Sequence, residues 1–437
     1  MTQKLLQNQW VKDATAFSRS NLASKLQSFF FYLTLLFLPT QFGKHFWPSF
    51  SYVMGQRIDY LSPTLYLTDI FILGLLLTTL WKKQLKISPL FLLFALYLSV
   101  TIFLSTSSLA GWYGFIRFLE MSFFAFSVRY LFPKREKTVG MLFSVGIIFE
   151  SILAGVQYLL QSSVGGFLYF LGERTFSSST PGIANVSVFG QLILRPYGTF
   201  SHPNVLAGYL LLGMIFAYFF LHKQQSLWSK ILLVLSIILG TLGLLLTFGR
   251  TAIVLWGAVI LVFFVLKRYS MKIKGAILGG IALLTALLFT SSPLVLERFL
   301  QFRIDESVTY REELARVSLQ MITKHPFFGV GLNHFIITLP QYSSINFLQP
   351  VHNIVLLLTS ETGLVGLLFV IAVSFGPLHS FFKSLRQNAS LSPLLVVLCC
   401  FFVIGMLDHY FLTIEQGQLL TAFLIGVLLH YSSLNPA

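Results

Sequence analysis

Long apolar runs limit this 437-residue chain to one class of fold. A helix of about 17–25 apolar residues is long enough to cross a hydrocarbon core roughly 30 Å thick. Hydrophobic residues make up 55% of the chain and charged residues only 10%, against roughly a quarter charged in soluble domains. A single soluble core cannot bury that much apolar surface, so we expect most of it to face lipid.

The runs predict an all-α integral membrane protein with about twelve transmembrane helices, forming one polytopic domain over residues 1–437. The first 27 residues are polar, and no small-residue cleavage site follows the first apolar run. We therefore interpret that run as a retained helix and not as a signal peptide. The predicted spans are residues 28–42, 64–81, 88–105, 111–131, 139–160, 203–221, 230–247, 251–267, 275–290, 351–376, 391–408 and 416–433.

The placement of Lys and Arg predicts the orientation of the chain. Eighteen of them lie in the N-terminal tail and in short tracts near helix ends, whereas the opposite set of loops carries ten. The positive-inside rule therefore predicts cytoplasmic termini and places the long loops 43–63, 161–202 and 291–350 outside. This topology and anionic lipids account for the net charge of +15, so we expect membrane lipids and no nucleic acid as partners.

The third outer loop, residues 291–350, is long enough to hold structure of its own. Thr309 followed by Glu312 is typical of a capping box, which would start a helix there and place Arg311 in its first turn. Apolar residues then recur at the spacing of an amphipathic helix that lies on the membrane or on the bundle. They are Tyr310, Leu314, Val317 and Met321.

Three predicted spans begin on the outer side with Arg or His next to the helix start. Pro203 and Pro350 are placed to enter the first turn of two of these helices. Helix N-termini offer unpaired N–H groups and a positive dipole, so together with Arg and His they favour binding of phosphate or pyrophosphate. The candidate residues at these starts are Arg195, His202, Asn204, Arg250, His352 and Asn353.

Each of these residues also has a structural interpretation. Arg250 could extend to the outer headgroups, and Arg195 could instead pin its loop. Arg311, beside two glutamates, could belong to a solvated helix face, and His352 could cap a turn. His202, His325 and His334 lie in tight connections, where turn residues are more common than catalysts.

The chemistry of a lipid pyrophosphate fits these residue types. Transfer from such a donor needs the leaving diphosphate stabilised, which permanently charged arginines can do without a metal. It also needs an acceptor hydroxyl held and deprotonated, for which a neutral His352 is suited. The sequence shows no metal-binding motif, and Cys399 and Cys400 sit together inside an apolar run, so we expect neither a metal nor another cofactor.

Charged residues inside the predicted spans form a second class. Arg117 and Glu120 are three residues apart on one helix, and we expect them to pair. Asp69, Glu150 and Glu361 have no obvious local partner. For Glu361 we expect a hydrogen bond to another helix.

Four segments resemble motifs of the O-antigen ligase and polymerase superfamily. RPYGTFSHPNVLA at 195–207 is similar to R-x-x-G-T-F-x-x-P-N-x-L-A, and LTFGRTA at 246–252 to T-x-S-R-G/T-A, with Gly249 in place of serine. Arg311 and HPFFGVGLNHF at 325–335 resemble the next motif, although Ala315 stands where it has an aromatic residue. VHNIVLLLTSETGLVG at 351–366 is similar to H-N-x-x-L-x-x-x-x-E-x-G-x-x-G.

The resemblance implies a GT-C membrane glycosyltransferase of the bacterial cytoplasmic membrane, with its active site on the periplasmic face. Such an enzyme takes a glycan from undecaprenyl pyrophosphate without a metal and gives it to a glycan, lipid or protein acceptor. The family's essential arginines fall on Arg250 and Arg311, and its essential histidine on His352. Arg195, His202, Asn204 and Asn353 would then bind substrate.

Two alternatives stay open. A polymerase of the same superfamily carries the same motifs and hands the glycan to another lipid-linked repeat. A transporter or flippase for lipid-linked oligosaccharide belongs to a different class, and is typically marked by internal repeats, broken helices and charges near the membrane midplane. Asp69, Glu150 and Glu361 are such charges, but no repeat is visible.

Overall fold

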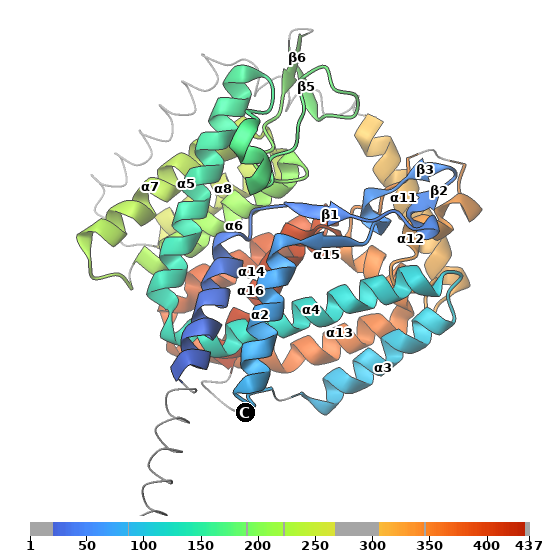
Figure 1. Cartoon of the computed structure of the whole chain (residues 1–437), viewed down its shortest axis with the longest axis horizontal. Coiled ribbons are helices and arrows are strands. Elements are labelled where there is room, and N and C mark those ends of the chain that lie inside the picture. Colours follow the sequence, from blue (N-terminus) through green and yellow to red (C-terminus); the bar gives the residue numbers. More distant parts are fainter. Residues whose placement is uncertain are drawn as a thin grey trace, which may run out of the picture.

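A computed structural model describes residues 21–85, 87–188, 191–221, 223–266, 306–344 and 347–432, and these are mostly helical (Figure 1). The first helix covers residues 21–36. The further helices of more than four residues are α2 (Leu67–Trp81), α3 (Pro89–Phe103), α4 (Ser108–Leu131), α5 (Glu136–Leu160), α6 (Pro203–Leu221), α7 (Leu227–Leu246), α8 (Arg250–Leu266), α11 (Glu306–Lys324), α13 (Ile354–Gln387), α14 (Ser392–Gly405) and α16 (Glu415–Ser432). The short helices α12 (Phe335–Thr338) and α15 (Tyr410–Thr413) and several 3-10 turns lie in the connections between them.

The helical membrane character predicted from the apolar runs is confirmed. Within the described residues, α5, α6, α7 and α13 are long and apolar enough to cross a membrane. Shorter apolar helices cover Leu67–Trp81, Pro89–Phe103, Arg250–Phe263 and Ala389–Gly405. The predicted span 275–290 lies outside the described residues, and the count of twelve stays a prediction.

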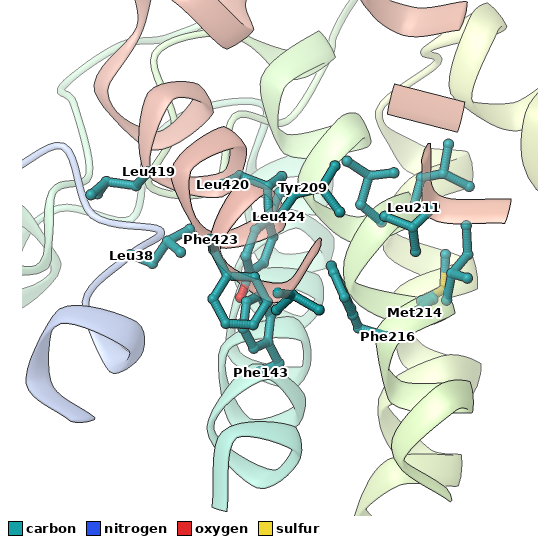
Figure 2. Close-up of a cluster of buried hydrophobic side chains, with 14 of the residues drawn as sticks. Leu38, Phe143, Tyr209, Leu211, Met214, Phe216, Leu419, Leu420, Phe423 and Leu424 are labelled. Carbon is teal, nitrogen blue, oxygen red and sulfur yellow. The ribbon is translucent and has the colours of Figure 1, made fainter. Parts of the chain in front are cut away.

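Helix α6 forms the centre of the main apolar core. It is buried along most of its length because it packs against α5, α7, α8, α14 and α16. Helix α7, in contrast, leaves most of its surface exposed. Figure 2 shows Phe143 of α5, Phe216 of α6 and Phe423 of α16 meeting in this core. The ring centroid of Phe423 lies 4.8 Å from that of Phe143 and 5.3 Å from that of Phe216. As predicted, α6 begins at Pro203.

The connections on the predicted outer side contain short antiparallel hairpins that the apolar pattern did not predict. β1 (Gly43–His45) pairs with β4 (Thr64–Tyr66), and between them β2 (Tyr52–Val53) pairs with β3 (Gln56–Arg57). β5 (Asn185–Val188) pairs with β6 (Gln191–Leu194) at one end of the molecule (Figure 1). Strands this short give no alternating sequence signal, yet they satisfy backbone groups where the chain leaves the helices.

Helix α11 carries the predicted apolar stripe but starts earlier than predicted. It begins by Glu306, so Thr309 is inside the helix and the predicted capping box is wrong. Arg311 is consequently not in the first turn. The stripe packs against the first outer loop and the start of α13, and this contact stabilises the helix. The buried residues of this cluster include Val53, Ile58, Leu61, Leu314, Val317, Met321 and Leu357.

Helix α13 is broken at Gly363, whose φ of 68° and ψ of 178° are not helical. The outer segment 326–331 fills the break: the N–H of Leu364 donates to the carbonyl of Pro326 (2.7 Å), and that of Gly331 donates to Glu361 (3.0 Å). A Cβ at position 363 would collide with the backbone of Phe327, so only glycine fits here.

The Glu361 carboxylate adds further contacts between α13 and the segment after α11; together with the backbone bonds at Gly363, these contacts are called the clamp below. It accepts hydrogen bonds from the backbone N–H groups of Asn333 (3.0 Å) and Phe335 (3.1 Å). The helix–helix hydrogen bond expected for Glu361 is therefore wrong: its partners are the amides of an outer loop that enters the bundle. The clamp joins the segment that follows α11 to the helix that follows His352.

Replacing Glu361 with Gln should loosen this loop. The amide side chain keeps only one acceptor oxygen and turns a donor toward a backbone N–H, at a cost of about 2 kcal/mol. We expect faster hydrogen exchange of the amides in 326–335 and a lower Tm. Glu312→Gln, at an exposed position of α11, is the matched control. Equal exchange in both variants would contradict the clamp.

Asp69, Arg117, Glu120 and Glu150, the other charged residues singled out inside the predicted spans, all have polar partners. Arg117 donates to Glu120 (2.7 Å), which confirms the predicted pair, and also to Asp69 (2.8 Å), and it forms an ion pair with Glu415. Glu150 accepts hydrogen bonds from the backbone N–H and the hydroxyl of Thr199. These groups join helices and loops on the outer half of the bundle.

Candidate active site

Polar side chains from three separate connections meet at the predicted outer ends of α6, α13 and α14, which are the first residues of α6 and α13 and the last residues of α14. His352 lies two residues before α13, and Asp408 and His409 follow α14. The rings of His352 and His409 are edge to face, with centroids 4.9 Å apart. Asn204, in the first turn of α6, donates from Nδ2 to the carboxylate of Asp408 (3.3 Å). Residues from distant parts of the sequence thus form one polar cluster.

His352 and Arg311 each bring a buried nitrogen that lacks a partner within the described residues: Nδ1 of His352 and Nε of Arg311. Buried polar atoms are nearly always paired, so two unpaired nitrogens in one cluster indicate a site for a ligand. Burial lowers the pKa of His352 to about 4; Arg311 acts in the same direction and Asp408 opposes it. The imidazole is therefore neutral at pH 7 and able to accept a proton.

Asp408 and His409 are the members of the cluster that sequence reasoning missed. Asp408 closes a predicted span and was given no role. Its carboxylate also accepts from the backbone N–H of His409 (2.8 Å). Burial opposes ionisation, but His409, His352 and Arg311 together lower the pKa of Asp408 below its usual range. An acid followed by histidine at the outer end of an apolar run is the signal that could have identified them.

Arg195 is buried and joins two of the connections that form the site. Its Nε donates to the carbonyl of Thr247 (2.8 Å), and its guanidinium also donates to the Oδ1 of Asn204 (2.7 Å). It therefore connects the turn before α8 to the start of α6, and through Asn204 to Asp408. Of the two roles left open by the sequence, these contacts favour pinning the loop.

His202 also belongs to this connection. Its Nδ1 accepts from the backbone N–H of Asn204 (3.1 Å). Burial, with help from Arg195, lowers the pKa of His202 to about 3, so this ring is neutral as well. Such a ring can offer hydrogen bonds to a bound ligand without adding charge.

Asn353 lies at the start of α13, as the sequence predicts, but Pro350 does not. Helix α13 begins at Ile354, so Pro350 is outside its first turn, contrary to the prediction. Asn353 is the N-cap, and its Oδ1 accepts from the N–H groups of Val355 and Leu356 (2.9 Å each). The helix therefore starts after its asparagine cap, and not at Pro350 as the proline had suggested. Asn353 thus occupies two of the N–H groups that had been expected to bind an anion.

Arg250 is the first residue of α8 and is half-buried. It directly follows the 247–249 turn that Arg195 holds through Thr247. The positive charge of Arg311 lowers the pKa of both His352 and Asp408.

The first outer loop covers one side of the cluster. Tyr60 packs edge to face against His409, with ring centroids 5.4 Å apart. The same loop packs on α11, which carries Arg311. The cluster is thus enclosed by protein on the side of Tyr60, and His352, Asp408 and Arg311 are each partly exposed.

The cluster also offers metal ligands, which the sequence did not reveal because His352 lies far along the chain from Asp408 and His409. His352, Asp408 and His409 each place one potential ligand atom within 4.8 Å of the others. The prediction that no metal binds rested on sequence motifs, and this group is not part of any such motif.

Comparison with known families gives one match. A family model described as O-antigen ligase matches residues 235–371, a stretch that includes Arg250, Arg311 and His352. A search of curated proteins gives no match. The resemblance found in the motifs is thereby supported independently over this part of the chain.

Proposed function

We propose that this chain belongs to the O-antigen ligase superfamily, whose family model matches residues 235–371, and that it transfers a glycan from a polyprenyl pyrophosphate to an acceptor hydroxyl. The donor would be undecaprenyl-linked, and the reaction would take place on the outer face of the bacterial cytoplasmic membrane. The observation that carries this proposal is the pair of unpaired buried nitrogens, Nδ1 of His352 and Nε of Arg311. A neutral base beside a permanent cation suits transfer from a diphosphate.

In the proposed reaction the acceptor hydroxyl attacks the anomeric carbon on the side opposite the diphosphate. A new carbon–oxygen bond forms as the bond to the diphosphate breaks, so the anomeric configuration inverts. The hydroxyl proton passes to neutral His352, and the leaving diphosphate takes the electron pair and is stabilised by Arg311 and Arg250. Asp408 would hold His352 and stabilise the imidazolium that forms.

The remaining site residues would shape the cavity around the donor. Arg195 and Asn204 fix Asp408, and His202 presents a neutral ring at the same helix start. Because guanidinium groups stay charged at any working pH, the diphosphate can leave without a metal ion. We therefore expect a chelator to leave the transfer rate unchanged.

The test is transfer by purified full-length protein in detergent, from a synthetic polyprenyl-pyrophosphate glycan. A product with inverted anomeric configuration, formed in the presence of EDTA, is the expected result. Transfer in detergent would also dismiss a flippase, since no membrane separates the substrates. Binding of the lipid-linked glycan with no bond formed to any acceptor would contradict the proposal and favour transport.

A polymerase is the second candidate, because the same superfamily motifs serve both reactions. Deleting the gene in its native cell distinguishes them. Loss of all polymer indicates a polymerase, and loss only of the attached form indicates a ligase.

The pH profile of transfer gives a further prediction. The pKa of His352 is lowered to about 4, so the neutral, proton-accepting form persists well below the usual value of 6.5. Transfer should therefore stay constant from pH 7 down to about 5 and fall as the pH approaches 4. His409 and His202, whose pKa values are lowered to about 3, stay neutral over that interval, and Asp408 stays ionised. An acid limb near pH 6.5 would contradict the assignment of His352 as the base.

A further inference from the structure

His352 and Asp408, which take part in the proposed transfer, form a triad with His409, which has no role in the transfer steps. The three ligand atoms of this triad lie within 4.8 Å of one another. Zinc bound to nitrogen and carboxylate oxygen at about 2.1 Å needs ligand atoms roughly 3.4 Å apart. Closing the triad thus requires the ligand atoms to approach one another by up to about 1.4 Å, which a movement of the partly exposed His352, with its unpaired Nδ1, can supply.

Hydrogen bonds from neighbouring residues orient two of the three potential ligands. The Nδ1 of His409 is hydrogen-bonded to the hydroxyl of Thr413 (2.7 Å), which fixes the ring and leaves Nε2 as its coordinating atom. Asp408 is held by Asn204 (3.3 Å) and by the backbone N–H of His409 (2.8 Å). Such outer partners orient metal ligands and raise affinity.

We propose that His352, Asp408 and His409 form an inhibitory site for a divalent first-row transition metal, with Zn²⁺ as the preferred ion. Two imidazoles and one carboxylate suit zinc and its neighbours, whereas Mg²⁺ and Ca²⁺ prefer oxygen ligands. Binding blocks transfer because the metal takes the lone pair of His352 that would accept the hydroxyl proton. The inhibitory effect therefore rests on the proposed function, whereas binding itself does not. The positive charge of Arg311 opposes the ion and lowers its affinity.

Binding is tested without any substrate, by titrating zinc into the purified full-length protein. The protein is first treated with a chelator to remove bound metal, and the chelator is then removed. Isothermal calorimetry should show one saturable Zn²⁺ site per chain and none for Mg²⁺. His409→Gln should weaken Zn²⁺ binding by at least about 10-fold, and Thr413→Val, which keeps all three ligands, by about 10-fold. His325→Gln, an exposed histidine of the outer loop, is the matched control and should bind as the unmodified chain does.

The same preparations then give the effect on transfer. Zinc should inhibit the unmodified chain at the concentrations that fill the site, and EDTA should reverse the inhibition. Absence of saturable binding, or unchanged affinity in both His409→Gln and Thr413→Val, would overturn the site. Binding at the triad with full transfer would overturn the inhibition. A protein that binds zinc but transfers no glycan would contradict the proposed function alone.

Discussion

His352→Gln is expected to lower the rate of glycan transfer by about 10²–10⁴-fold, the usual contribution of a general base. Glutamine keeps a polar side chain of similar length but cannot accept the hydroxyl proton. The loss should appear in kcat, because the arginines that bind the diphosphate remain. Single-turnover transfer by the purified variant, compared with its binding of the donor, measures this.

His325→Gln is the matched control for this loss. His325 is exposed and lies in the same outer region, where its side chain is far more accessible than that of His352. Its replacement should leave kcat unchanged. If His352→Gln inserts normally and transfers at the rate of His325→Gln, His352 is not the base.

The sequence predicted those parts of the molecule that depend on local pattern. A run of apolar residues that begins at Pro203 defines a helix and its start without any tertiary contact. Arg117 and Glu120 pair because they are three residues apart on one helix. The helix starts near His352 and in α11 were misplaced, because an asparagine cap and a packed apolar stripe override proline and capping-box signals.

Contacts between distant segments account for what the sequence did not reveal. Asp408 reaches Asn204 only after α6 and α14 have packed together. Glu361 finds its partners in a loop that enters a broken helix, and no spacing rule connects it to Asn333 or Phe335. The candidate base and arginine could be identified from residue type and motif, but the acid beside them required the fold.

Arg311→Gln is expected to lower kcat by about 10²–10³-fold, as for the removal of one group that stabilises developing charge. The charge on the diphosphate grows as its bond to the sugar breaks, so a fixed cation stabilises the transition state more than the bound donor. Arg311→Lys keeps the charge but loses the planar fork that can bind two phosphate oxygens at once. Its rate should fall between those of the unmodified chain and Arg311→Gln.

Arg316→Gln separates this role from the general charge of α11. Arg316 is exposed on the same helix and is paired with Glu313 (2.9 Å from Nε). Its loss should change transfer little, because exposed ion pairs contribute little and the charge of Arg316 is already compensated by Glu313. Equal losses in Arg311→Gln and Arg316→Gln would mean that α11 acts through its overall charge. A loss confined to Arg311 would show that one guanidinium, beside His352, faces the leaving group.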